Sequence, residues 1–74
     1  MEMLMNKQDA QKMNEHIEGM IDHANHVLFI ANNSGDEETK LRVQRVLGAV
    51  VTELDFELLE PIYKKFPELK PAEL

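Results

Sequence analysis

A heptad stripe between residues 7 and 32 constrains this chain more than any other feature. Small and apolar residues recur there at alternating steps of three and four, the spacing that places side chains on one face of an α-helix. The stripe comprises Ala10, Met13, Ile17, Met20, Ala24, Val27 and Ala31. A helix over 7–32 would be about 39 Å long. Because that exceeds the diameter of a compact domain of this size, the helix must lie against something equally long.

The length and composition of the chain limit how it can become stable. With 74 residues and no cysteine, it is expected to be one helical domain without disulfides or thiolate metal sites. A chain this short buries only about 60–65 % of its unfolded surface, so one core provides little stability. Self-association is therefore favoured. The ends, 1–5 and 67–74, are predicted to be flexible.

The segment 32–36 predicts a turn between two antiparallel helices. Asn and Gly there accept the left-handed backbone that ends a helix. The next helix is capped either by Ser34 with Glu37 or by Asp36 with Thr39. Valine and leucine at helical spacing then predict a second helix over about 36–58. The expected fold is an all-α antiparallel helical hairpin.

Pro61 predicts a kink or the start of a third element. Proline removes a hydrogen bond inside a helix but suits its first turn. Ile62, Tyr63 and Phe66 follow at helical spacing, so a short C-terminal helix is predicted over about 61–66. This segment is expected to pack across the open end of the hairpin or onto a neighbouring chain.

The segment 27–31 is apolar on every side, with Phe29 opposite the main stripe. A helical segment of this kind is normally buried on every side, which one hairpin cannot achieve. The sequence therefore predicts a homodimer, as a four-helix bundle. The candidate interface residues are Ile17, Ile21, Ala24, Leu28, Phe29, Val46, Val50, Phe56, Tyr63 and Phe66.

The three histidines are the only candidates for metal chemistry in the sequence. His16 and His23 share a helix face but stand two turns apart, about 10 Å, too far for one ion to bridge directly. His23 and His26 are close enough to chelate. The main interpretation is structural or surface histidines and no metal. The alternative is a bundle that binds a metal or small ligand through His16, His23 or His26.

The net charge and the lack of known motifs limit the classes of function that this chain is expected to have. With 14 acidic and 8 basic residues, the chain is expected to bind neither nucleic acid nor an anionic membrane. No catalytic or cofactor motif is present, and the acidic set Glu53, Asp55, Glu57 and Glu60 is interpreted as a solvated face. The expectation is a cytoplasmic, non-enzymatic module for protein–protein interaction or regulation. It would act as a homodimer and bind a second protein.

Overall fold

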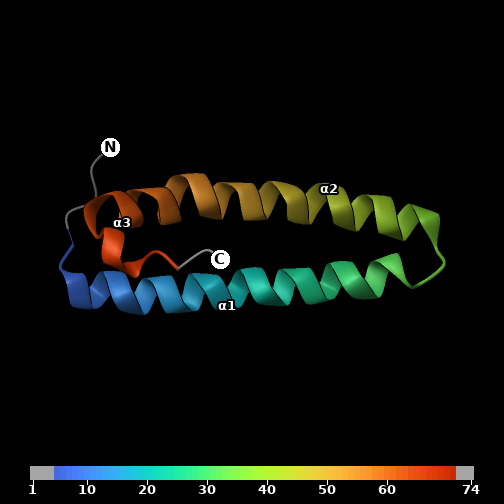
Figure 1. Ribbon diagram of the computed structural model, residues 1–74. Coiled ribbons are helices and arrows are strands. Elements are labelled where there is room, and N and C mark those ends of the chain that lie inside the picture. Colours follow the sequence, from blue (N-terminus) through green and yellow to red (C-terminus); the bar gives the residue numbers. More distant parts are fainter. Residues whose placement is uncertain (1–4, 72–74) are drawn as a thin grey trace.

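The computed structural model describes residues 5–71, which form a helical hairpin without strands in that range (Figure 1). Helix α1, Lys7–Asn32, runs antiparallel to α2, Glu37–Glu53. A π-helical segment, η1 (Leu54–Leu59), joins α2 to α3 (Glu60–Lys65), and a 3₁₀ turn, η2 (Pro67–Leu69), follows. The molecule measures 45 × 27 × 20 Å. The predicted all-α hairpin is confirmed, whereas its assembly into a four-helix bundle stays a prediction.

Side-chain caps determine where α1 begins and ends. The Asn6 Oδ1 atom accepts a hydrogen bond from the Asp9 backbone N–H at 2.8 Å, so Asn6 is the N-cap of α1. At the other end, the Asn33 side-chain amide donates to the Phe29 carbonyl at 2.8 Å. Gly35 then adopts a φ of 82°, a left-handed backbone that reverses the chain direction at little steric cost.

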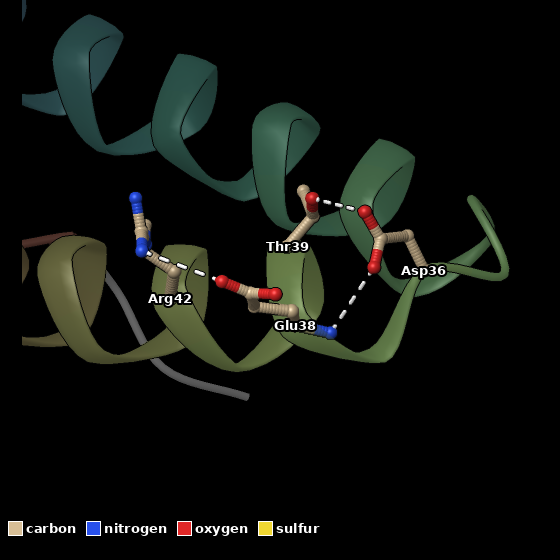
Figure 2. Close-up of polar contacts among 4 residues, drawn as sticks. All are labelled: Asp36, Glu38, Thr39 and Arg42. Atoms are coloured by element: carbon tan, nitrogen blue, oxygen red, sulfur yellow. Dashed lines mark hydrogen bonds and ion pairs between the residues drawn. The ribbon is translucent and has the colours of Figure 1, made fainter.

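Asp36 caps the start of α2, as Figure 2 shows. Its carboxylate accepts hydrogen bonds from the Glu38 N–H at 3.2 Å and the Thr39 hydroxyl at 2.7 Å. The Thr39 hydroxyl, followed by the backbone N–H groups, lowers the pKa of Asp36. Of the two predicted caps, Asp36 with Thr39 is the one formed. Ser34 instead donates to the Ala31 carbonyl at 2.8 Å and helps to close α1.

The second helix bends instead of stopping near residue 58. The backbone keeps right-handed helical angles at Leu54, Leu59 and Glu60, so the helix continues into α3. The Glu60 N–H bonds to the Asp55 carbonyl, five residues back. This wider π spacing lies immediately before Pro61, which lacks an N–H and would clash with an ordinary preceding turn. The kink expected at Pro61 therefore takes the form of a π-helical segment.

The buried cluster lies at the open end of the hairpin, where α3 folds back toward α1 (Figure 1). It consists of Ala10, Ile17, Leu59 and Ile62, and only 1 % of Ile62 is exposed. Half-buried apolar side chains surround it: Met5, Ile21, Leu54, Leu58, Tyr63, Phe66 and Leu69. The core therefore unites the start of α1 with the last part of the chain.

Glu60–Leu69, which we call the C-terminal strap, is anchored along most of its length. Leu69 packs against the buried cluster, and Lys7 Nζ lies 2.9 Å from Glu68 Oε2. Because both charged side chains are about half exposed, this ion pair contributes little to stability. Residues 67–69 form a 3₁₀ turn, and the flexibility of the ends stays a prediction. Residues 1–4 and 72–74 lie outside the described range.

Two glycine substitutions should change stability in opposite directions. Gly35→Ala places a side chain on a left-handed backbone, so we expect unfolding to require about 1 kcal/mol less free energy. Gly48→Ala lies in α2 with open space around the new Cβ, and we expect a gain of about 1 kcal/mol. Urea unfolding followed by circular dichroism measures both. Equal effects of the two substitutions would contradict this account of the turn.

Candidate functional site

Of the seven residues in the predicted heptad stripe, four are buried in the structure and three are exposed. The structure buries Ala10, Ile17, Ala24 and Ala31, as predicted. The remaining members of the stripe, Met13, Met20 and Val27, are exposed. Their places are taken by the residues that follow each of them, Asn14, Ile21 and Leu28, which are buried or half-buried. The rotational position of α1 is therefore one that buries the flank with Asn14, Ile21 and Leu28 and exposes the flank with Met13, Met20 and Val27.

Helical geometry gives the angle between the two flanks of the stripe. In a heptad series, residues three and four positions after a seam residue lie about 50° to either side of it. Met20 therefore lies on one side of Ile17, and Ile21 lies on the other. Ile21 is half-buried against the buried cluster, whereas Met20 is 49 % exposed. The side of α1 that carries Met20 is left uncovered.

Helix α2 likewise has one half-buried and one exposed set of apolar residues. Leu47 and Val51 are half-buried, whereas Val46 and Val50 are exposed. Seen from one end, antiparallel helices wind in opposite senses, and their seams face one another. The flanks three positions after the seam residues, Met20 in α1 and Val50 in α2, therefore come onto the same side of the hairpin.

The uncovered side of the hairpin forms one apolar surface across two helices. We call it the methionine–valine face and define it as Met13, Met20, Val27, Val46 and Val50. Each of these side chains is 37–49 % exposed. Isolated exposed apolar residues are normal in proteins, but contiguous apolar patches commonly mark interaction sites.

The strap covers the opposite side of the hairpin. The Tyr63 hydroxyl lies 2.6 Å from Asn14 Oδ1 and 3.1 Å from Glu18 Oε1, and it donates its single hydrogen to these acceptors. Asn14 is only 8 % exposed, so this bond satisfies a buried polar group. Burial, then the Glu18 carboxylate, raises the pKa of Tyr63 to about 12. One side of the hairpin is thus covered, and the other is open.

The predicted interface residues fall into four groups. Ile17, Ile21, Ala24 and Leu28 are buried or half-buried on α1, and Tyr63 and Phe66 are half-buried within the strap. Val46 and Val50 lie on the methionine–valine face. Phe29 and Phe56 are exposed but lie outside that face.

Sequence reasoning missed the three exposed members of α1 because it assigned them to the seam. The available signal was that both flanks of the stripe are apolar. One flank carries Met13, Met20 and Val27, and the other carries Ile21 and Leu28. One facing helix cannot cover both flanks.

Polar side chains of α1 line a shallow hollow on its surface. The hollow has a volume of about 230 Å³ and is lined by Glu18, Ile21, Asp22 and Asn25. Its two carboxylates belong to exposed residues, whereas acid–base catalysis favours desolvated groups. The hollow therefore offers water-accessible acidic groups beside one half-buried isoleucine.

The histidines are arranged along the exposed part of α1. The rings of His23 and His26 are 6.4 Å apart and tilted. His26 Nδ1 lies 3.0 Å from the Asp22 carbonyl and 3.8 Å from the Asp22 carboxylate. Within residues 5–71, no group of three or more His, Cys, Asp or Glu side chains is placed to share a metal ion. The structure therefore adds no support for the metal-binding alternative.

Comparison with known proteins gives no indication of function, so a functional proposal must rest on the fold and the surface of this chain. No protein-family model, curated protein or solved structure matches this chain. Over the described part of the chain, none of the helices combines the length and hydrophobicity that a bilayer crossing requires. The fold defines an all-α hairpin with one long straight helix and one bent helix.

Removing the Tyr63 hydroxyl should weaken the attachment of the strap. Tyr63→Phe leaves the buried Asn14 side chain without this partner, so we expect the free energy of unfolding to fall by roughly 1–2 kcal/mol. Because the folded-state pKa of Tyr63 is raised, its contribution is constant below pH 10 and is lost as the pH rises toward 12.

Chemical unfolding between pH 8 and 12 tests this expectation, with wild type and Tyr63→Phe compared at each pH. The difference between the two proteins should shrink above pH 10. Tyr63 is the only tyrosine, so its absorbance titration also reports the pKa directly. A midpoint near 10 would contradict the buried hydrogen bond.

Proposed function

We propose that this chain is a small cytoplasmic, non-enzymatic protein–protein interaction module that acts as a homodimer. The observation that carries the proposal is the methionine–valine face, an apolar surface shared by α1 and α2 on the side away from the strap. In the proposed dimer, this face of one hairpin packs against the same face of a second copy. Two hairpins joined in this way make a four-helix bundle.

The shape and surface area of the chain support a partner of its own size. A compact monomer of 8.6 kDa exposes about 4,700 Å², whereas this chain exposes 5876 Å². The difference, about 1,200 Å², exceeds the roughly 800 Å² that each partner buries in a standard interface. The radius of gyration, 14.8 Å, also exceeds the value of about 11 Å expected for a compact domain of this length.

The chemistry of the face suits packing between helices. Methionine is flexible and polarizable, so Met13 and Met20 can fill an irregular interface without a prearranged pocket. Val46 and Val50 provide a stiffer surface on α2. The rest of the molecular surface is rich in charge, with a net value of −6 per chain. In this proposal the dimer presents an acidic exterior, and a second protein would bind it through a basic surface.

A charge on the methionine–valine face should dissociate the dimer. We expect wild type to sediment at twice the 8.6 kDa chain mass and Met20→Glu to sediment as a monomer over the same micromolar concentrations. The physical reason is that association would bury an unpaired carboxylate. Because Met20 is about half exposed in the hairpin, the helix content of the variant should be close to that of wild type.

Phe29→Glu is the matched control for this experiment. Phe29 is 67 % exposed, more than Met20, but it lies on the side of α1 away from α2 and outside the methionine–valine face. The sequence alone favoured Phe29 as an interface residue, whereas the proposed interface omits it. We therefore expect this variant to remain a dimer. Dissociation by Phe29→Glu but not by Met20→Glu would contradict the proposed surface.

A further inference from the structure

The geometry points to a dimer in which the two hairpin tips lie at opposite ends. We propose that α1 packs on α1 of the second copy and α2 packs on α2 of the second copy, through the methionine–valine face. This arrangement rests on the proposed function, because it requires the dimer to form.

Two-fold symmetry allows two ways to join these faces. If the symmetry axis runs along the hairpin, the tips lie together, and α1 of one copy meets α2 of the other. If the axis crosses the hairpin at right angles, the tips lie apart, and each helix meets its own counterpart. We call these the aligned and the opposed arrangements.

The apolar residues are distributed as the opposed arrangement requires. Met20 lies at the middle of α1, with Met13 seven residues before it and Val27 seven residues after it. A two-fold axis crossing near Met20 therefore brings Met13 of one copy close to Val27 of the other. Val46 and Val50 likewise lie on either side of the middle of the helical segment 37–59, so the same axis exchanges them.

Charges at the two ends of α2 also favour the opposed arrangement. Glu53 and Glu57 lie seven residues after Val46 and Val50, on the same side of the helix and toward the open end. Arg42 lies one turn before Val46, toward the tip, where it is exposed and forms an exposed ion pair with Glu38 of its own helix at 3.6 Å (Figure 2). Antiparallel packing of α2 on its counterpart places Arg42 of each copy beside Glu53 and Glu57 of the other.

The aligned arrangement lacks this charge complementarity. It places the open-end part of α2 against the open-end part of α1 in the second copy. Glu57 would then lie over Met13, which sets a carboxylate against an apolar side chain. Arg42 would lie against the tip end of α1 in the second copy, away from Glu53 and Glu57.

One spin-label distance distinguishes the two arrangements. The chain has no cysteine, so Glu37→Cys at the exposed tip accepts a single nitroxide label. From residue 37 to the middle of the 37–59 segment, the helix rises about 16 Å, so the two labels should be about 35 Å apart in the opposed dimer. In the aligned dimer, the two tips lie together, and the distance falls below about 25 Å.

Double electron–electron resonance on the full chain measures this distance. A distribution centred near 35 Å supports the opposed arrangement, and one below 25 Å overturns it while leaving the proposed homodimer intact. A signal without dipolar modulation, from a sample that sediments as a monomer, overturns the proposed function as well. The two failures are therefore distinguishable.

A charge exchange provides an independent measurement. Arg42→Glu places three carboxylates together in the opposed dimer, so we expect the dimer dissociation constant to rise about tenfold. Adding Glu53→Arg and Glu57→Arg to this variant restores opposite charges and should return the constant to within about threefold of wild type. Failure of this restoration would overturn the opposed arrangement.

Arg45→Glu is the control for the charge exchange. It makes the same change in net charge as Arg42→Glu, but Arg45 lies on the side of α2 away from the methionine–valine face. We expect its dimer dissociation constant to stay within about twofold of wild type. An effect equal to that of Arg42→Glu would show that only net charge matters and would overturn the specific pairing.

Discussion

The rotation of α1 about its own axis determines which surface this protein offers to a partner. Ala10, Ile17, Ala24 and Ala31 lie in the seam in any reasonable packing, because they form the centre of the apolar stripe. Alternative packings differ in which of the two flanks of that stripe is buried. The structure buries part of Ile21 and Leu28 on one flank and leaves Met20 and its neighbours exposed on the other. The open apolar face of the hairpin is a direct consequence.

The strap explains why this rotation is tolerated despite a polar residue in the seam. Asn14 occupies a buried position on the chosen flank, and an unpaired amide there would cost free energy. The hydroxyl of Tyr63 in the strap donates a hydrogen bond to Asn14, and the neighbouring Ile62 belongs to the buried cluster. The strap therefore covers one side of the hairpin and satisfies its one buried polar side chain, within the described residues. The other side keeps its apolar residues exposed to water.

Local signals predicted the helices well because local chemistry controls them. Asn6, Gly35 and Asp36 act at helix ends through hydrogen bonds and backbone angles that involve only nearby residues. The end of the second helix was less predictable. Pro61 indicated that the regular α-helix would be interrupted, but proline is compatible with a break, a kink or a π-helical segment. Contacts made by Leu59 and Ile62 with α1, distant in sequence, select the bend.

The sequence by itself determined that the chain is helical, where α1 and α2 begin, and that its apolar surface exceeds what one facing helix can cover. Helical periodicity and capping are properties of neighbouring residues, so they can be read from spacing alone. Only the tertiary structure decided which flank of α1 is buried. The two flanks differ by a rotation of about 100°, and both carry apolar side chains at heptad spacing. The choice between them follows from contacts across the fold, above all that of Tyr63 with Asn14.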